Sequence, residues 1–262
     1  MRCASPRDVV RLLVGTPLII MLDIDGTLCD IVERAGEARI PASAQTALRQ
    51  LRARSGDGTH VAFVTGRSVA DARRMLDIPG AVIYGNHGME HLSADGNIRA
   101  RERPERATRQ LRAAARDLAS IVAAFPGTSL EDKRLTLTLH FRAMRPALLP
   151  ELNARVADIA NRRSLRLADG KCVINVLPAG SLTKGDAVLE VIHEVAGASA
   201  SASILFVGDD VTDEDAFRAL REVPGAVTVR VGGADDISLA QFSLGGPRDV
   251  HELLSLLVEA RL

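Results

Sequence analysis

The N-terminal 100 residues and the C-terminal third alternate short apolar runs with stretches of helical periodicity. The apolar runs lack polar positions, which indicates strands of a parallel sheet that is covered on both faces. The predicted strands are residues 18–22, 61–64, 81–84, 203–207 and 226–231. The predicted helices are residues 42–54, 68–76 with Ser68 as N-cap, 184–195, 213–222 and 249–262. This alternation predicts an α/β fold with a doubly wound, mostly parallel, Rossmann-like core.

The middle of the chain has a different pattern. A stretch rich in Ala, Arg and Leu comes first, and a strand that alternates apolar and polar residues follows, as a half-exposed antiparallel strand does. The predicted elements are helices at 103–125 and 147–161 and strands at 135–141, 165–167 and 172–176. We therefore expect an inserted α+β domain at residues 101–178, and a core domain formed by residues 1–100 and 179–262.

The composition argues against two classes of partner. The chain carries 33 basic and 33 acidic residues, and aromatic residues make up only 3%, with no Trp. Nucleic-acid-binding proteins normally have a basic excess and, for single strands, aromatic stacking platforms. The apolar run at residues 12–22 is too short to span a bilayer and is interrupted by Gly15 and Pro17. We therefore expect neither nucleic acid nor a membrane as a partner.

Three cysteines, Cys3, Cys29 and Cys172, lie far apart in the sequence. Their odd number and their spacing fit neither a disulfide framework nor a zinc site. The run at residues 12–22 also lacks the cleavage site of a signal peptide. We expect free thiols in a monomeric, cytoplasmic protein. Cys29 follows Asp25 by four residues and would be sensitive to oxidation if its thiol were exposed.

Ligands of open α/β sheets bind at the carboxyl ends of the strands, so these ends are the candidate sites of chemistry. The first predicted strand is followed by Asp23, Asp25 and Gly26 in the segment Asp-Ile-Asp-Gly-Thr. An ordinary Asp-Gly turn is the alternative. However, two acids directly after a buried strand repel each other unless a cation or a substrate offsets their charge. They fit a nucleophile and a proton donor with a metal between them.

The second and third predicted strands end in polar residues beside glycines. Thr65, followed by Gly66 and Arg67, could hold a phosphate oxygen at the head of the next helix, although an ordinary strand end is the alternative. Asn86 and His87 lie between two glycines, which indicates backbone brought close to a ligand. A structural histidine is the alternative here.

Two further segments complete the candidate site. Lys184 begins a predicted helix, where a lysine has the wrong charge unless an anion is bound beside it; a solvated surface lysine is the alternative. Residues 209–215 contain five acids in seven positions. Helix capping explains part of this run, but not Asp209 and Asp210, which directly follow a strand. With the two acids of the first strand, they make an oxygen-rich site suited to a hard cation, above all Mg²⁺.

Together these segments resemble the haloacid dehalogenase superfamily of phosphohydrolases. Its signature is DxD after the first strand, Thr or Ser after the second, a lysine before a helix, and paired acids after a fourth strand. The positions that match in this order are Asp23 and Asp25, Thr65, Lys184, and Asp209 and Asp210. More narrowly, the chain resembles the trehalose-6-phosphate phosphatase family from about residue 18 to its end. The supporting segments are residues 23–28, 85–88, 131–133, 140–142, 183–187 and 208–217.

This resemblance implies a role for each residue of the site. Asp23 would attack phosphorus to form an acyl phosphate, and Asp25 would protonate the leaving oxygen and later deprotonate water. Thr65 and Lys184 would neutralise the phosphoryl oxygens, and Asp210 would orient Lys184 or a metal-bound water. The implied catalytic residues are Asp23, Asp25, Thr65, Lys184 and Asp210. The implied Mg²⁺ ligands are Asp23, the backbone carbonyl of Asp25, and Asp209.

The resemblance also makes the inserted domain a cap that binds the sugar. Glu131 and Lys133 would contact sugar hydroxyls, although an exposed turn with a surface ion pair is the alternative. The family usually has a glutamate in the strand before the lysine motif, where this chain has Asn175, which can hydrogen-bond but lacks the charge. The implied substrate-binding residues are Thr65, Gly66, Arg67, Asn86, His87, Glu131, Lys133, Arg142, Asn175 and Lys184.

The expected reaction is therefore Mg²⁺-dependent hydrolysis of a sugar phosphate, with trehalose 6-phosphate as the preferred substrate. The substitution at Asn175 keeps other substrates open: sucrose phosphate, a glycosylglycerate phosphate or a hexose phosphate. A sugar-phosphate mutase is a further alternative. A catalytically silent regulatory domain is an alternative from a different class, and the complete set of catalytic side chains argues against it.

Overall fold

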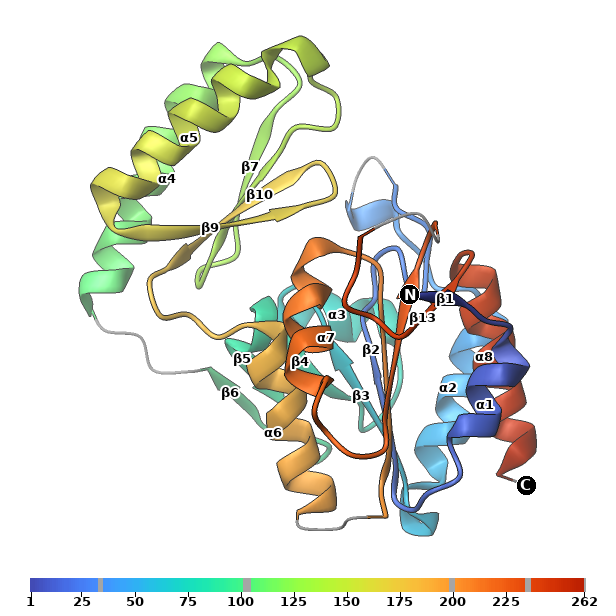
Figure 1. Ribbon diagram of the computed structural model, residues 1–262. Helices are drawn as coiled ribbons and strands as arrows, with labels where there is room; N and C mark the ends of the chain where they lie inside the picture. Colours follow the sequence, from blue (N-terminus) through green and yellow to red (C-terminus); the bar gives the residue numbers. More distant parts are fainter. Residues whose placement is uncertain (33–34, 101–104, 198–200, 234–236, 262) are drawn as a thin grey trace. The chain divides into compact units, whose positions relative to one another are not determined.

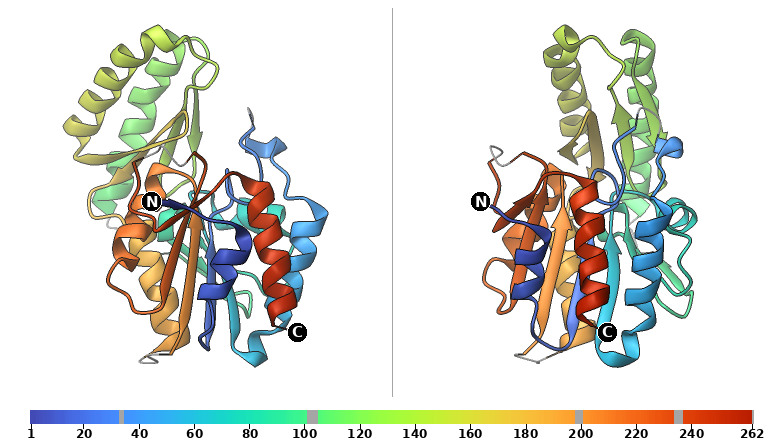
Figure 2. Two further views of the ribbon diagram at one scale, coloured as in Figure 1. Left: turned by 45° about the vertical axis from the view of Figure 1, so that its right-hand side comes forward. Right: turned by 90° about the vertical axis from the view of Figure 1, so that its right-hand side faces the viewer.

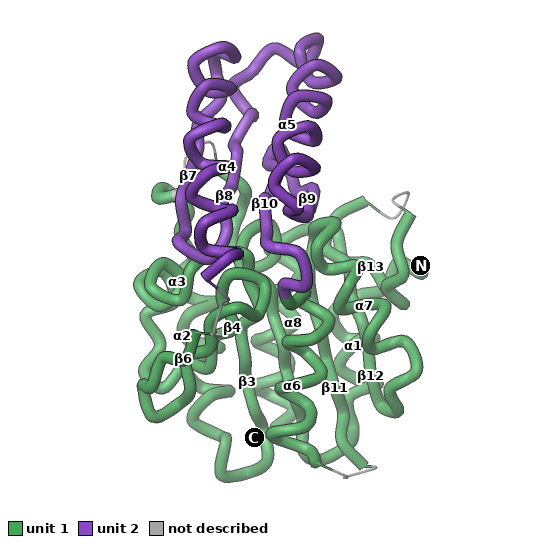
Figure 3. Tube along the Cα trace, turned by 90° about the vertical axis from the view of Figure 1, so that its left-hand side faces the viewer, with its two compact units in different colours: residues 1–100, 182–262 green, residues 101–181 purple. Residues whose placement is uncertain are grey.

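The computed structural model describes residues 1–32, 35–100, 105–197, 201–233 and 237–261. The chain divides into two compact units, coloured separately in Figure 3. Unit 1 comprises Met1–Ala100 and Leu182–Leu262, and unit 2 comprises Arg101–Ser181. Unit 2 corresponds to the insertion that the sequence pattern placed at residues 101–178, and those bounds stay a prediction.

A nine-stranded sheet forms the centre of unit 1 in the described part of the chain. Its order is β1-β13-β12-β11-β2-β3-β4-β5-β6. Neighbouring strands from β1 to β4 are parallel, and β5 and β6 add an antiparallel edge. The strands are β1 (Arg2–Cys3), β2 (Leu18–Leu22), β3 (Thr59–Val64), β4 (Val82–Gly85), β5 (Glu90–Leu92), β6 (Ile98–Ala100), β11 (Ser203–Gly208), β12 (Ala226–Val231) and β13 (Phe242–Leu244).

Helices cover both faces of this sheet, as Figures 1 and 2 show. Because side chains alternate along a strand, Leu18, Ile20 and Leu22 of β2 pack into one core, and Ile19 and Met21 pack into the other. The first core includes α1 (Pro6–Leu12), α2 (Ala42–Ala53), α3 (Val69–Leu76) and α8 (Pro247–Ala260). The second includes α6 (Lys184–Ala196) and α7 (Glu214–Leu220). The doubly wound core is therefore confirmed.

The elements that the sequence pattern missed are short. α1 has seven residues, and its Ser5 N-cap accepts a hydrogen bond from the Asp8 N–H in a capping box. The strands β1, β5, β6 and β13 have two or three residues each, too few to show a period. No helix among the described residues has the length and apolar character needed to cross a bilayer.

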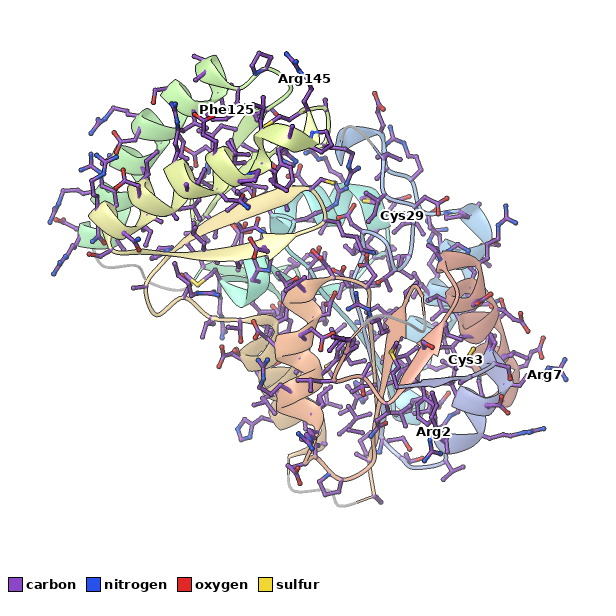
Figure 4. All side chains as sticks on the ribbon, turned by 45° about the horizontal axis from the view of Figure 1, so that its top comes forward. Arg2, Cys3, Arg7, Cys29, Phe125 and Arg145 are labelled. Carbon is purple, nitrogen blue, oxygen red and sulfur yellow. The ribbon has the colours of Figure 1, made fainter. Side chains whose placement is uncertain are left out.

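Unit 2 has its own hydrophobic core, which packs against one face of an antiparallel sheet. In the described residues this sheet has four strands, in the order β7-β8-β10-β9. The strands are β7 (Ser129–Asp132), β8 (Leu137–His140), β9 (Leu165–Gly170) and β10 (Val173–Pro178). The helices α4 (Glu105–Ala124) and α5 (Leu149–Arg163) pack on one face. There the guanidinium of Arg155 lies 5.3 Å from the ring centroid of Phe125, which Figure 4 labels.

Candidate active site

Three buried aspartates from two neighbouring strands form the centre of the candidate site. Strand β2 pairs with β11 in parallel, and the backbone N–H of Asp23 donates to the Val207 carbonyl at 2.9 Å. Asp23 therefore leaves the sheet beside Asp209, and Asp213 follows one short turn later. Each of these three aspartates offers a carboxylate oxygen that lies within 4.8 Å of those of the other two. Residues 23 and 209 are thus close enough to share one cation.

Lys184 joins this cluster from the first turn of α6. Its ammonium lies 2.9 Å from Asp23 Oδ1 and 2.8 Å from Asp213 Oδ1, and the side chain is 2% exposed. Burial alone would lower the pKa of Lys184, but the two carboxylates outweigh it and raise that pKa above its ordinary value. The anions that make a lysine acceptable at a helix N-terminus are therefore these aspartates. Thr183, the N-cap, accepts the Asp186 N–H in a capping box.

The cluster has more negative than positive charge. Burial raises the pKa of Asp23 well above its usual range, and Asp213, Asp209 and Asp25 raise it further, while Lys184 alone opposes them. Carboxylate oxygens are the ligands that Mg²⁺ prefers, and a divalent cation would offset the excess charge. The donor set therefore fits Mg²⁺, with Asp23, Asp209 and Asp213 as the side chains able to hold it.

Glycine at position 26 is required by this packing. Gly26 has φ +78°, and a Cβ atom there would collide with the Asp209 carboxylate. Thr27, the next residue, lies with its hydroxyl 3.4 Å from Asp209 Oδ1. Asp25 and Gly26 thus form the turn that the sequence suggested. This turn also allows the loop after β2 to lie directly against the acid cluster.

Asp213 lies in the part of the acidic run that helix capping explains, yet it is the aspartate that orients Lys184. Its second oxygen, Oδ2, accepts the backbone N–H groups of Asp209 and Asp210 at 3.0 and 2.9 Å. The carboxylate of Asp210 instead accepts the Val211 N–H at 2.8 Å. Asp213, and not Asp210 as expected, is therefore the residue that orients Lys184. The other expected role of Asp210, to orient a metal-bound water, stays a prediction.

Asp25 is paired with Arg67 in unit 1. The guanidinium donates to both carboxylate oxygens, Nε to Oδ2 at 2.6 Å and Nη2 to Oδ1 at 2.5 Å. Arg67 is 13% exposed and Asp25 is 38% exposed, so the pair lies at the edge of the buried cluster. Arg67 thus contacts an expected proton donor, a role that the sequence did not indicate because 42 residues separate the two positions.

The segments after β3 and β4 are bonded to each other. The Thr65 hydroxyl accepts the Arg67 N–H at 3.2 Å, and the His87 N–H donates to the Thr65 carbonyl at 3.0 Å. Asn86 and His87 both have positive φ, 48° and 59°. A Cβ at Gly66 would lie 2.8 Å from the His87 ring, so the glycine permits this close approach. Phosphate binding by these five residues stays a prediction.

The Cys29 thiol lies in the loop after β2, labelled in Figure 4, and is 2% exposed. Burial raises its pKa to about 12, with a further contribution from Asp25. We expect iodoacetamide at pH 8 to label Cys3 and Cys172, which are exposed, and to leave Cys29 unmodified in the folded protein. Peptide mass spectrometry with and without denaturant checks this; equal labelling of all three thiols in the native state would contradict it.

Unit 2 presents a row of polar side chains across its sheet. Register pairs Glu131 with Thr138 and Thr138 with Asn175, so these three share one face. Glu131 Oε2 lies 3.0 Å from His140 Nε2 and 3.8 Å from the Lys133 ammonium. Glu131 belongs to β7, not to an exposed turn.

Asn175 is 5% exposed, and its Oδ1 accepts the Thr138 hydroxyl at 2.8 Å. Arg142, by contrast, is half-buried and donates to the Lys171 carbonyl at 3.2 Å. Thr138 and His140 were not singled out from the sequence as candidate site residues. Both lie at polar positions of the alternating strand predicted at residues 135–141, and that alternation could have indicated them. The structure thus brings Glu131 and Asn175 into one sheet of unit 2, and Lys133 directly follows β7.

The family model described as trehalose-phosphatase matches residues 21–242, which include every residue of the acid cluster. The chain belongs to the trehalose-phosphatase family. The resemblance that the motifs indicated is therefore confirmed. The matched range spans both units, so the family relationship includes the inserted domain as well as the core.

Curated relatives from Mycobacterium tuberculosis support this membership. A trehalose-phosphate phosphatase is 33% identical over 244 residues, which is 92% of this chain and 61% of the relative. An uncharacterized glycosyl hydrolase is 33% identical over 251 residues, 94% of this chain and 19% of the relative. This chain thus spans less than two thirds of these relatives' own length.

A solved structure shows the same fold. The C-terminal domain of the Candida albicans trehalose-6-phosphate phosphatase superposes with a TM-score of 0.87 at 22% identity, covering 98% of each chain. At this identity the likeness establishes the fold, including an inserted domain, and carries nothing further about chemistry. The α/β class expected from the sequence is confirmed by it.

Proposed function

We propose that this chain is a Mg²⁺-dependent phosphatase that hydrolyses trehalose 6-phosphate to trehalose and phosphate through an aspartyl-phosphate intermediate. The observation that carries the proposal is the buried position of Asp23, which lies within reach of two further carboxylates and an ammonium. Family membership supports the phosphatase chemistry, and the relative named a trehalose-phosphate phosphatase supports the substrate.

The proposed reaction has two steps, each a displacement at phosphorus. A carboxylate oxygen of Asp23 attacks phosphorus, the bond from phosphorus to the sugar oxygen breaks, and Asp25 gives a proton to that oxygen. Asp25 then removes a proton from water, which attacks the acyl phosphate and releases inorganic phosphate and the free Asp23 carboxylate. Because Asp25 is held by Arg67, its carboxylate must leave that pair, at least in part, before it carries a proton.

Asp23, Asp209 and Asp213 are the side chains that would hold Mg²⁺, together with the Asp25 carbonyl. When bound, the cation reduces the repulsion between the attacking carboxylate and the phosphate. Lys184 adds a fixed positive charge beside the attacking oxygen, and Asp213 keeps that ammonium in place. Thr65 supplies a hydroxyl at the end of the neighbouring strand.

Glu131, Lys133, Arg142 and Asn175 are proposed as the sugar-binding residues of unit 2. The polar row on its sheet supports Glu131 and Asn175, because hydroxyl groups are recognised by such donors and acceptors. The ammonium of Lys133 lies 3.8 Å from Glu131 Oε2, beside this row. The neutral amide of Asn175 favours a second candidate, a phosphatase of another sugar phosphate. We further propose a cytoplasmic monomer that acts on small molecules. The balanced charge argues against a nucleic-acid partner, and the free thiols fit a reducing compartment.

A panel of phosphate esters tests this function. With Mg²⁺, we expect release of inorganic phosphate from trehalose 6-phosphate to exceed release from sucrose 6-phosphate, glucose 6-phosphate and a glucosylglycerate phosphate by at least tenfold in kcat/KM. Excess EDTA should abolish release, and added Mg²⁺ should restore it. A clear preference for another ester would replace the substrate, and no release from any ester would favour a silent domain.

Glu131→Gln should separate sugar recognition from chemistry. We expect kcat/KM for trehalose 6-phosphate to fall about 10–100-fold, because a hydrogen bond to a charged group contributes about 1.5–3 kcal/mol. Hydrolysis of p-nitrophenyl phosphate, which has no sugar, should stay within about twofold. Ser129→Ala, an exposed change on the same strand, is the control. Equal losses on both substrates would show that Glu131 does not recognise the sugar.

A further inference from the structure

Unit 1 holds a second group of metal-ligating side chains besides the aspartate cluster. His91 lies on β5, and Glu190 and Glu194 lie on α6. The two glutamates are four residues apart and so share one face of the helix. One ligand atom from each residue lies within 4.8 Å of those from the other two. α6 packs beside β4 and β5 in Figure 1, which explains how the three meet.

Two of these side chains are oriented by one buried aromatic residue. Tyr84 of β4 is 1% exposed, and its hydroxyl donates to Glu194 Oε2 at 3.1 Å. Its ring also stacks on His91, with centroids 4.3 Å apart and 12° between the planes. Such outer contacts fix the direction in which a ligand presents its donor atom. The histidine ring and one carboxylate are therefore preorganised toward the same point.

The His91 Nε2 atom has an unmet hydrogen-bonding requirement. It is buried and has no hydrogen-bond partner among the described residues of the protein. Buried polar atoms are rarely left in this state, and a bound ion is one of the accepted reasons for an exception. One ring nitrogen of His91 lies close enough to an oxygen of each glutamate for the three to share an ion. Because His91 Nε2 has no partner in the described residues, neither glutamate hydrogen-bonds to it.

We propose that His91, Glu190 and Glu194 bind one divalent transition-metal ion of the Zn²⁺ type. Imidazole nitrogen favours Zn²⁺ over Mg²⁺, which prefers oxygen ligands, so this site and the aspartate cluster select different ions. Ligand atoms of a tetrahedral zinc site lie about 3.3 Å apart, from zinc–ligand distances of about 2.0–2.1 Å. The ligand atoms lie within 4.8 Å of one another, so a change in the glutamate rotamers is needed to bring them to this spacing, and water would complete the coordination.

The ion would tie the antiparallel edge of the sheet to α6 and would not take part in catalysis. Glu190 and Glu194 lie six and ten residues beyond Lys184, which is about 9 and 15 Å along the helix axis. A ligand that binds only the folded state stabilises it. Zinc should therefore raise the unfolding midpoint of the protein without replacing Mg²⁺ in the reaction.

Calorimetric titration of untagged protein with Zn²⁺ tests this site. The background carries Cys3→Ser and Cys172→Ser, because exposed thiols bind zinc, and excess Mg²⁺ occupies the aspartate cluster. We expect one zinc per chain with micromolar or tighter affinity and a midpoint raised by several degrees. His91→Gln should weaken binding at least tenfold and abolish the thermal shift. His193→Gln, the same change at an exposed position of α6, should bind zinc as the parent does.

Three results would overturn the proposal: a parent that binds no zinc under these conditions, a His91→Gln variant that binds as tightly as the parent, or loss of binding in His193→Gln. If zinc also enters the aspartate cluster, the stoichiometry should be two in the parent and one in His91→Gln. Should His91→Gln fail to fold by circular dichroism, Glu190→Gln decides, with the same expected loss of one zinc.

Discussion

Asp23→Asn should abolish phosphate release while the protein stays folded. An amide does not form the acyl phosphate, so the expected loss in kcat is about 10⁴-fold or more. Folding should be preserved, since Asn is nearly the same size and removes a negative charge from a cluster that has an excess of it. We expect the unfolding midpoint in EDTA to be equal to or above that of the unmodified protein.

Rapid acid quench with ³²P-labelled substrate identifies the residue that carries phosphate. The unmodified protein and Asp25→Asn should retain acid-stable label on the chain, and Asp23→Asn should retain none. Asp30→Asn, an identical change at an exposed position seven residues on, is the matched control and should behave as the unmodified protein. More than about 1% residual turnover in Asp23→Asn would remove it as nucleophile, by the magnitude expected for such residues.

The sequence predicts the bounds of those strands whose residues are apolar because both faces of the sheet are covered. The run Leu18–Leu22 is apolar at every position because both faces of β2 are covered, so its bounds match the prediction. Strand β12 (Ala226–Val231) matches for the same reason. In contrast, β5 owes its place to pairing with β4 and has three residues, so local periodicity does not show it.

Some residues of the candidate site were likewise predictable from the sequence, and others were not. Asp23 and Asp209 were predictable because each directly follows a strand, and neighbouring parallel strands end at one edge of the sheet. The choice between Asp210 and Asp213 was not predictable, since both belong to one acidic run. The short 3₁₀ turn Val211–Asp213 decides it, because it directs Asp213 inward to Lys184.

Lys184→Met should have the largest effect on stability, and Mg²⁺ should reverse much of it. Lys184 is the cation paired with both Asp23 and Asp213, so its removal leaves buried carboxylates uncompensated. Breaking a buried pair in this way costs about 3–5 kcal/mol in the free energy of unfolding. A divalent cation in the cluster restores positive charge, so the difference from the unmodified protein should be large in EDTA and small in excess Mg²⁺.

Urea unfolding of both proteins in EDTA and in Mg²⁺ measures this difference. Lys171→Met, the same change at an exposed position, should alter the free energy of unfolding by no more than about 0.5 kcal/mol in either buffer. kcat of Lys184→Met should stay about 10²–10³-fold low even with Mg²⁺, because the metal restores charge without replacing the ammonium beside the attacking oxygen. If Lys184→Met lost equal stability in both buffers, no cation would share the Asp23 cluster, and the metal site would have to lie elsewhere.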